Sequence, residues 1–222
     1  MGDAIGGRTE RSRVRRLPEL ASYDADVVHA IFDATSVCHV GTIVDGAPLV
    51  LPSLHVRRGD TLLLHGSRSS RLLRSMVELP TVSVAATLVD GLIVARSTFN
   101  SSIAYRSAVV FGPARLLGDD ERAAALDDLI DGILPGRSSE VRSSSAVELR
   151  RTAVVEVVIE EASAKLSAGP PEDDPDDIAS AVWAGVVPLE VAWGEPIDAP
   201  DGAVGRGEVP VADSVRRLGG WS

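Results

Sequence analysis

Residues 62–71, LLLHGSRSSR, decide the fold, because an apolar strand leads directly into the hydroxyl- and Arg-rich start of a helix. Ser69 and Ser70 can cap a helix over residues 71–78, whose first backbone N–H groups have no partner inside the helix. Those N–H groups favour an anion, and Arg71 can hold phosphate oxygens through two parallel bonds. The stretch therefore predicts a phosphate-binding turn. The alternative interpretation is an ordinary helix cap with surface arginines.

The residues before this turn indicate one helix and then a meander of strands. A capped amphipathic helix is predicted over residues 24–32, where apolar residues recur at helical spacing. The predicted strands and turns are strands at 37–44, 48–56 and 62–65, with turns at Asp45-Gly46 and Gly59-Asp60.

The residues after the turn predict more antiparallel strands with helices inserted between them. The predicted elements are a hairpin of 81–89 and 92–96 across Asp90-Gly91, a strand at 105–117, a helix at 119–133 and a last strand at 153–164. Strands and helices do not alternate regularly, so the pattern favours a mainly β fold, an antiparallel barrel with inserted helices, over a parallel α/β fold.

The chain has 222 residues, of which 45% are hydrophobic, and this is enough for one domain with extensions. Residues 1–20 are predicted to be a flexible basic N-terminal arm, and residues 21–168 the barrel. Residues 169–222 form an acidic, Pro-rich extension whose last part, 198–222, is predicted to be flexible. This extension contains the apolar stretch 179–189 with Trp183, so we expect it to pack on the barrel or on a partner subunit.

A net charge of −10 argues against nucleic acid or an anionic membrane as the main partner. No membrane-spanning run or signal peptide is recognisable, which predicts a cytoplasmic protein. The single cysteine, Cys38, excludes an internal disulfide, and no metal-site or nucleotide motif occurs. Among the four histidines, His29, His39 and His55 are interpreted as packing or surface residues, whereas His65 ends a strand beside the predicted turn and could face a ligand.

A second group of polar residues lies in and between the apolar strands of the later hairpin. Arg96 and Ser97 begin a polar loop, and Arg106 and Ser107 follow it. Hydroxyl and guanidinium groups inside apolar strands need partners, so a ligand is one interpretation. The other is a solvated loop whose arginines pair with surface carboxylates.

Four motifs in this order resemble the FMN-binding split-barrel superfamily of pyridoxamine phosphate oxidase, most closely its branch of nitroimidazole-resistance flavoproteins. They are LPS (51–53), LHGSRSSR (64–71), ARSTF with YRSAVVFG (95–99 and 105–112) and WAGVVPL (183–189), and the resemblance extends over residues 23–196. It implies a homodimer with FMN at the subunit interface. The residues that it assigns to the cofactor are Pro52, Ser53, His65, Gly66, Ser69, Ser70, Arg71, Arg96, Ser97, Arg106, Ser107 and Trp183.

The resemblance implies a flavin-dependent oxidoreductase that acts on an unidentified small molecule. In the oxidase, Arg and His after the late Trp segment hold the pyridoxal phosphate, and residues 186–189, VVPL, offer neither. Oxidation of vitamin B6 is therefore not expected. The alternatives are a non-catalytic flavin-binding or sensing protein, a deazaflavin protein, or a haem protein with His65 or another histidine as axial ligand.

Overall fold

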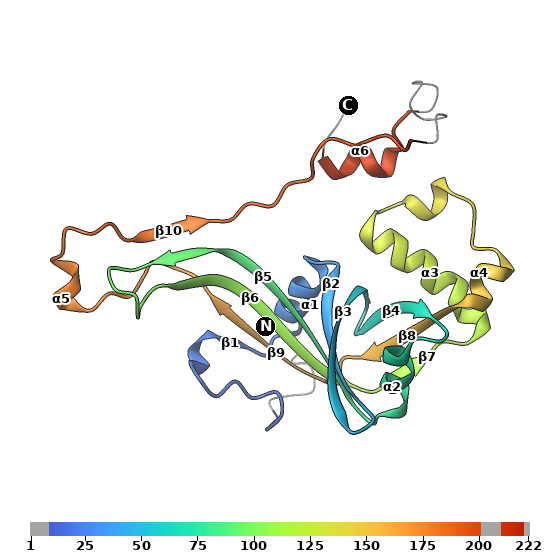
Figure 1. Ribbon diagram of the computed structural model, residues 1–222, viewed down its shortest axis with the longest axis horizontal. Coiled ribbons are helices and arrows are strands. Elements are labelled where there is room, and N and C mark those ends of the chain that lie inside the picture. Colours follow the sequence, from blue (N-terminus) through green and yellow to red (C-terminus); the bar gives the residue numbers. More distant parts are fainter. Residues whose placement is uncertain (1–8, 201–209, 220–222) are drawn as a thin grey trace.

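Antiparallel pairing joins the strands into one open sheet. The structure is a computed structural model that describes residues 9–200 and 210–219. In these residues the strand order is β1-β9-β6-β5-β2-β3-β4-β8-β7, and β10 pairs with β5 (Figure 1). The two end strands of this order do not pair with each other, so the barrel is split. This confirms the predicted fold class, a mainly β split barrel with inserted helices.

Strands β5 and β6 form a long ribbon that extends away from the rest of the sheet (Figure 1). The strands are β1 (Ala21–Ser22), β2 (Val37–Val44), β3 (Ala47–Arg58), β4 (Thr61–Ser67), β5 (Val82–Val94), β6 (Ser102–Gly112), β7 (Ala114–Leu116), β8 (Thr152–Val158), β9 (Glu161–Ser167) and β10 (Gly185–Pro188). The helices are α1 (Ala25–Asp33), α2 (Arg71–Glu78), α3 (Asp119–Ile133), α4 (Ala146–Arg151), α5 (Pro175–Ile178) and α6 (Asp213–Gly219), with 3-10 helices η1 (Pro18–Leu20) and η2 (Arg137–Glu140).

The meander β2-β3-β4 and the helices α1, α2 and α3 confirm the predictions closely. Asp24 caps α1, because its carboxylate accepts a hydrogen bond from the Asp26 N–H at 2.9 Å. Asp45 and Gly46 have φ angles of 52° and 75°. This is the left-handed backbone that a two-residue hairpin turn requires, and it joins β2 to β3.

The hairpin predicted at Asp90-Gly91 is wrong, because β5 runs through these residues as one strand. The register of β5 against β6 shifts between Val89 and Gly91, which marks a β-bulge. Strand β10 passes close to Gly91, where an added Cβ would lie 2.4 Å from the carbonyl oxygen of Val187. The glycine therefore permits a close approach of two backbones and does not form a turn.

Two of the predicted long strands are each divided in two. Residues 105–117 form most of β6 and then β7, with Pro113 between them, and residues 153–164 form β8 and the start of β9. The two breaks lie against each other, since the Val158 N–H donates to the Pro113 carbonyl at 3.0 Å. Strand β8 pairs with β4 and β7, whereas β9 pairs with β6 and β1. The chain therefore pairs with different strands before and after each break, in β6–β7 and in β8–β9. Local sequence does not reveal this change of partner.

Aliphatic side chains fill one large core and one smaller core, and β4 is buried between them. Leu62 and Leu64 belong to the large core, together with Phe32 of α1 and Met76 of α2. Leu63 faces the other way and packs under α3 with residues such as Leu129. Burial of a leucine side chain contributes about 1.5–3 kcal/mol, so both faces of β4 stabilise the fold. This explains the uninterrupted Leu62-Leu63-Leu64 run.

Residues 9–20 contact the sheet at a few points and are mostly exposed, and the flexibility predicted for residues 1–20 stays a prediction. The Arg11 guanidinium pairs with Glu161 at 3.0 Å and lies 5.6 Å from the centroid of the Phe111 ring. Ser12 is buried beside it. A carboxylate and a ring face thus hold an arginine that the sequence placed in solvent. Residues 1–8 lie outside the described residues.

The described part of the C-terminal extension contacts the rest of the chain through Asp173, which accepts hydrogen bonds from Arg96, through β10 and through α6. Strand β10 pairs with residues 91–94 of β5. Farther along, Ser214 of α6 is buried, and its N–H donates to Glu140 of η2 at 2.8 Å. Helix α6 differs from the flexible end predicted over residues 198–222, of which 201–209 and 220–222 lie outside the described residues.

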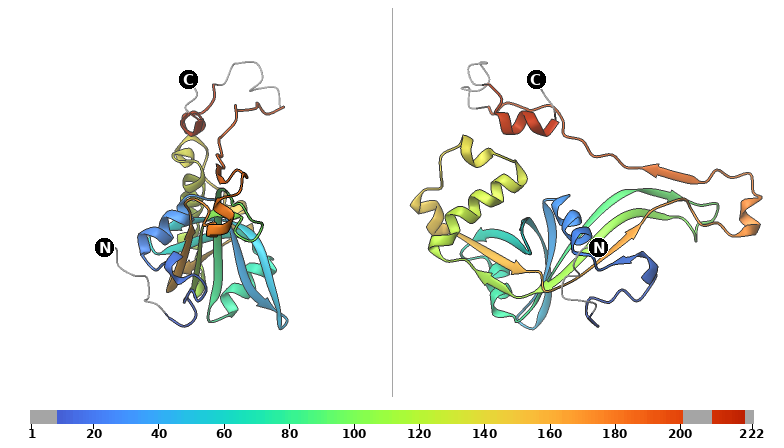
Figure 2. Two further views of the ribbon diagram at one scale, coloured as in Figure 1. Left: turned by 90° about the vertical axis from the view of Figure 1, so that its left-hand side faces the viewer. Right: turned by 180° about the vertical axis from the view of Figure 1, so that it is seen from behind.

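Residues 191–200, which follow β10, stand away from the body of the chain (Figure 2). Their apolar side chains Val191, Trp193 and Ile197 are 91%, 65% and 96% exposed. None of the helices in the described part of the chain combines the length and apolarity that a membrane crossing needs.

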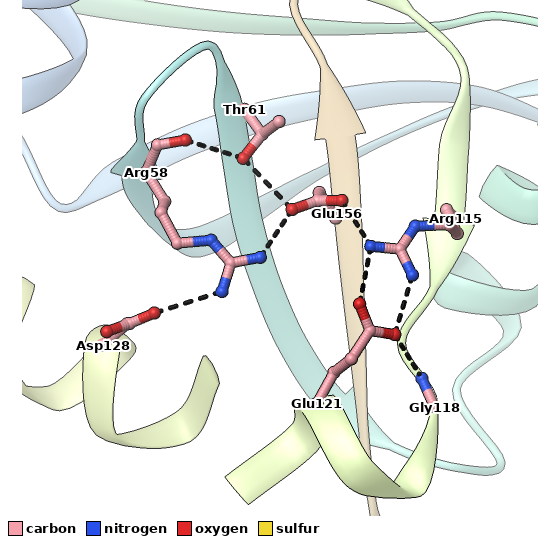
Figure 3. Close-up of polar contacts among 7 residues, drawn as sticks. All are labelled: Arg58, Thr61, Arg115, Gly118, Glu121, Asp128 and Glu156. Atoms are coloured by element: carbon pink, nitrogen blue, oxygen red, sulfur yellow. Dashed lines mark hydrogen bonds and ion pairs between the residues drawn. The ribbon is translucent and has the colours of Figure 1, made fainter. Parts of the chain in front are cut away.

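A buried carboxylate, Glu156 of β8, joins the sheet to α3 (Figure 3). Arg58 donates to it at 2.6 Å and Arg115 at 2.7 Å. The same two arginines reach α3, where Arg58 meets Asp128 at 3.1 Å and Arg115 meets Glu121 at 2.8 Å. Burial raises the pKa of Glu156, but the bonds from Arg115 and Arg58 outweigh burial and hold this pKa below its ordinary value of 4.5.

Replacement of Glu156 by glutamine is expected to lower the free energy of unfolding by about 1–3 kcal/mol at pH 7, because two charge-assisted hydrogen bonds are lost. The folded-state pKa is depressed, so the contribution of the carboxylate is complete above its unfolded pKa and disappears as pH falls through the folded pKa. Urea denaturation should therefore show that the wild-type protein and the variant differ less in free energy of unfolding at acidic pH than at pH 7.

The matched control is Glu10→Gln, because Glu10 also joins two arginines, Arg13 and Arg15, but is exposed. We expect less than about 0.5 kcal/mol for this variant. Equal losses in the two variants, or a difference that does not change with pH, would contradict the assigned role of Glu156.

Candidate functional site

The turn between β4 and α2 presents hydroxyl groups at the start of the helix. Ser70 caps α2 by accepting a hydrogen bond from the Leu73 N–H at 3.3 Å, as predicted. Ser69 bonds to its neighbour instead, with its Oγ 2.8 Å from the Ser67 Oγ. Gly66 lies close to α2, since a Cβ there would approach the Leu73 side chain to 3.2 Å. The predicted cap is confirmed, whereas phosphate binding by the turn stays a prediction.

Five arginines gather around this turn, and one of them pairs with a carboxylate. Arg68 meets Asp119 at 3.4 Å, and its N–H donates to the Arg151 carbonyl, so the end of α4 lies beside the turn. Four arginines form no ion pair with another described residue, and these are Arg71, Arg74, Arg150 and Arg151. We call the five arginines the basic patch. Asp45 and Glu78 line the same cavity as Arg71 and Arg74 but form no ion pair with them. Unpaired positive charge on a chain of net charge −10 favours an anionic ligand here.

A cavity of about 320 Å³ opens beside the first turns of α2. Arg71 and Arg74 line it from the helix, and Val44 and Asp45 line it from the β2–β3 turn. Sequence analysis singled out Arg71 but missed Arg74. The signal was available, because residues three apart in a helix lie on the same face.

The sheet presents an outward face of mostly small side chains next to this region. Its register places Pro52, His39, Ala85 and Val109 in one row across β3, β2, β5 and β6. Ser107 lies two residues along β6 and therefore on the same face. Ser53 pairs with the fully buried Cys38, so it lies on the opposite face from Pro52. The structure thus brings Pro52 and Ser107 to one face and turns Ser53 toward the core.

Two of the four histidines are engaged within the chain. His55 is buried, its Nε2 lies 3.0 Å from the Phe32 carbonyl oxygen, and burial lowers its pKa. The Nε2 of His29 faces Asp60 at 3.3 Å. His39 and His65 are exposed and have no hydrogen-bond or ion-pair partner among the described residues. They are the histidines whose ring nitrogens are available to a ligand.

The arginines predicted near the later loop have carboxylate partners. Arg96 donates to the Asp173 carboxylate through its backbone N–H and through Nη1, both at 2.6 Å. Arg106 makes two bonds to Asp90 at 2.9 and 2.7 Å, and the hydrogen bonds from Arg106 hold the pKa of Asp90 below its ordinary value. This pairing with carboxylates is the alternative interpretation given above.

The predicted serines of this region bond to the backbone. The Ser107 Oγ donates to the Lys165 carbonyl at 3.4 Å, and the Ser97 Oγ accepts a bond from the Asn100 N–H at 3.1 Å. Trp183 comes just before β10, is 64% exposed and lies against Gly185, where a Cβ would come within 2.9 Å of its ring.

The predicted site residues form two groups that one chain does not bring together. The turn before α2 lies in the main body, whereas β10 and the loop before β6 lie at the far end of the ribbon (Figures 1 and 2). His65, Gly66, Ser69, Ser70 and Arg71 belong to the first group. Arg96, Ser97 and Trp183 belong to the second, and Pro52 and Ser107 lie on the sheet between them.

The chain belongs to the pyridoxamine 5'-phosphate oxidase family, which it matches over residues 24–166. Among solved structures, it is similar to the flavocytochrome Anf3 from Azotobacter vinelandii, with 35% identity, a TM-score of 0.88 and coverage of 95% of this chain and 97% of that one. It is also similar to an FAD and haem binding protein from Mycobacterium smegmatis, with 39% identity, a TM-score of 0.86 and coverage of 90% and 97%.

A third solved structure shares the fold at lower identity. It is assigned to 5-nitroimidazole antibiotic resistance in Bacteroides thetaiotaomicron and is 21% identical, with a TM-score of 0.55 and coverage of 65% of this chain and 85% of that one. A search of curated proteins found no match. The family predicted from the sequence motifs is confirmed.

Proposed function

We propose that this protein binds a flavin and a haem and is a flavin-dependent oxidoreductase for a small molecule. The observation that carries the proposal is the pair of unpaired arginines, Arg71 and Arg74, which line a cavity at the capped start of α2. The two relatives described above, one a flavocytochrome and one an FAD and haem binding protein, support it. The absorption spectrum of the purified protein tests it, because we expect twin flavin bands together with a Soret band.

The turn before α2 fits a flavin phosphate. The first N–H groups of α2 and the Arg71 guanidinium offer donors to an anion. One acidic side chain of the helix, Glu78, lines the same cavity. FMN, the cofactor predicted from the sequence, and FAD both carry this phosphate. A bound flavin supplies the electron or hydride transfer. The protein then needs to bind, orient and shield it, which is consistent with the absence of a catalytic triad in the sequence.

The outward face of the sheet fits a haem, whose iron His39 would hold through its imidazole. His39 is exposed, and Val37, Ile43 and Val50 around it are 51%, 53% and 63% exposed. A porphyrin needs an imidazole for its iron and apolar walls for its ring. We favour His39 over His65 because exposed apolar side chains lie on the same face of the sheet as His39.

We further propose that two copies associate through this face as a homodimer. Exposed Val37, Ile43 and Val50 form an apolar surface of a kind that soluble monomers seldom leave uncovered. Sedimentation at micromolar concentration should give one species of twice the 23.3 kDa chain mass. A monomer that retains its flavin would refute the dimer.

Replacement of Arg71 by alanine is expected to weaken FMN binding by about 10–100-fold, because each charge-assisted bond to phosphate contributes roughly 1.5–3 kcal/mol. Riboflavin lacks the phosphate, so its affinity should hardly change. Flavin fluorescence titration measures both affinities. Equal losses for the two ligands in a folded variant would place the phosphate elsewhere.

The proposal has two weaker competitors. A deazaflavin would bind to the same turn through its own phosphate, and its spectrum differs from that of a flavin. A protein that stores or senses flavin without catalysis would show the spectrum but no turnover. Reduction of the bound flavin by a nicotinamide donor, followed by its reoxidation by an added acceptor, would separate an oxidoreductase from a storage protein.

A further inference from the structure

A second cavity, of about 350 Å³, adjoins the basic patch and has mainly apolar walls. Its apolar lining comes from α2, β7 and β8 and consists of Leu73, Val77, Leu116 and Ala153. Val77 and Leu116 are 37% and 49% exposed, so this lining is open to solvent. Arg68 and Arg74 line the same cavity. An apolar space thus opens between two arginines of the patch.

The arginines of the basic patch are all exposed, and they lie next to one another. Arg74 borders both this apolar cavity and the polar cavity beside Arg71. The Arg68 N–H donates to the Arg151 carbonyl at 3.2 Å, which places Arg151 alongside Arg68. The elements α2, β7 and α4 lie at the end of the molecule opposite the far end of the ribbon (Figure 1). The apolar cavity and the arginines therefore share one surface.

The carboxylates near this surface leave most of its positive charge free. Asp119 meets Arg68 at 3.4 Å, but its side chain is 85% exposed, and exposed ion pairs contribute little to stability. Asp119 also pairs with Arg122 at 2.6 Å. Arg68 can therefore exchange Asp119 for a carboxylate of another molecule. Asp45 and Glu78 line the polar cavity and do not line the apolar one.

An apolar cavity with a rim of arginines has the construction of a protein-binding site. The centre of a protein–protein interface is apolar and its rim is polar, and arginine is among the residues that contribute most to binding. One anchoring cavity implies a small interface, and small interfaces are typical of transient encounters between redox proteins. Uncompensated positive charge on a chain of net charge −10 also selects for a partner with an acidic surface.

We propose that the basic patch and the apolar cavity beside it form the docking site of a small acidic electron-carrier protein. An apolar side chain of the carrier enters the cavity, and its carboxylates meet Arg68, Arg74 and Arg151. The inference rests on the proposed oxidoreductase function and supplies its electron source. Each reduced carrier loses one electron, so two carriers together give the flavin two electrons, and two protons come from water.

The dependence of the reaction on salt tests this docking, because both proteins would carry a net negative charge. Added salt weakens the repulsion between the two net charges, which raises the rate, but it also weakens a local attraction to the patch, which lowers the rate. Reduced two-iron ferredoxin and reduced flavodoxin, both acidic, serve as probes in stopped-flow measurements. We expect the second-order rate constant of flavin reduction to fall about tenfold as salt rises from about 0.01 to 0.5 M. A rate constant that rises with salt would refute the docking site.

Two variants separate the charge of the patch from its cavity. Arg151→Glu should lower the rate constant by about five- to tenfold at low salt and have little effect at high salt. Val77→Ser removes an apolar wall and should weaken binding of the oxidised carrier by about fivefold at either salt concentration, as measured by isothermal titration calorimetry. This binding measurement requires no turnover.

The matched controls are Arg16→Glu and Val141→Ser. Arg16 is an exposed arginine of the N-terminal segment with no ion pair among the described residues. Val141 is 43% exposed and does not line the apolar cavity. We expect neither variant to change carrier binding. If Arg16→Glu slows the reaction as much as Arg151→Glu, net charge and not the patch controls the encounter, and the proposal is wrong.

Reduction by dithionite separates a failure of the docking site from a failure of the flavin function. If dithionite reduces a bound flavin while neither ferredoxin nor flavodoxin binds to the protein, the docking site is wrong and the flavin function stands. If anionic lipid vesicles or a single-stranded oligonucleotide bind more tightly than either carrier and lose affinity in Arg151→Glu, the patch is a general polyanion site and the proposal is likewise wrong. A protein that binds no flavin would overturn both.

Discussion

Replacement of His39 by alanine is expected to abolish the Soret band of the purified protein while flavin remains bound. The imidazole of His39 is exposed on the apolar outward face and has no partner among the described residues, so it is free to coordinate an iron. Loss of a residue that only orients a metal ligand lowers metal affinity by about 10–100-fold, and loss of the ligand itself should have at least that effect. Haem titration followed by absorption measures the loss.

The control is His65→Ala, which removes the other exposed imidazole. We expect this variant to keep its Soret band, and we expect added imidazole to restore the band to the His39 variant. The reverse result, with haem lost from the His65 variant alone, would make His65 the residue that holds the haem iron. A Soret band that survives both substitutions would refute histidine ligation by either residue.

Replacement of Gly112 by alanine is expected to lower the free energy of unfolding by about 3 kcal/mol or more, or to prevent folding. Gly112 ends β6 where the β8–β9 ribbon crosses it, and a Cβ there would lie 1.8 Å from the carbonyl oxygen of Val158. The obstacle is backbone, so no side-chain rotation relieves it. Stability of a domain is about 5–15 kcal/mol, and the loss is a large part of it. Urea denaturation at pH 7 provides the measurement.

Two other glycines separate this effect from a general glycine effect. Gly194 has open space around its Cβ position, so Gly194→Ala should change stability by less than about 0.5 kcal/mol. The atoms nearest to an added Cβ at Gly91 belong to the short β10, so Gly91→Ala should release residues 185–188 to fast hydrogen exchange while the sheet stays folded. If Gly112→Ala unfolds no more easily than Gly194→Ala, the crossing is looser than the structure indicates.

The sequence alone was enough to predict the helix caps and the hairpin turn that neighbouring residues form among themselves. Asp24 and Ser70 cap helices through bonds to residues two or three positions away, and Asp45-Gly46 forms its turn alone. The order of these elements, together with the four motifs that resemble a known family, then predicted the split barrel. These features could be predicted because no distant segment takes part in them.

The wrong predictions concern residues whose role depends on distant segments. Gly91 looked like a turn because β10, almost a hundred residues later, was not known to approach it. Pro113 did not reveal a strand break because the break depends on Val158 across the sheet. The interpretation of His39 as a packing or surface residue is a different case, because the structure does show His39 exposed at the surface. Only the pairing of β2 with β3 and β5 shows which face of the sheet it occupies.

Strand β10 also has a consequence for how the protein behaves in a concentrated solution. An unpaired strand edge is a template on which other chains can add, and Leu92-Ile93-Val94 would offer such an apolar edge on the far half of β5. β10 covers this edge over residues 91–94. Its own outer edge is only four residues long and ends at Pro188, which has no N–H to donate. The C-terminal extension therefore protects the ribbon against aggregation.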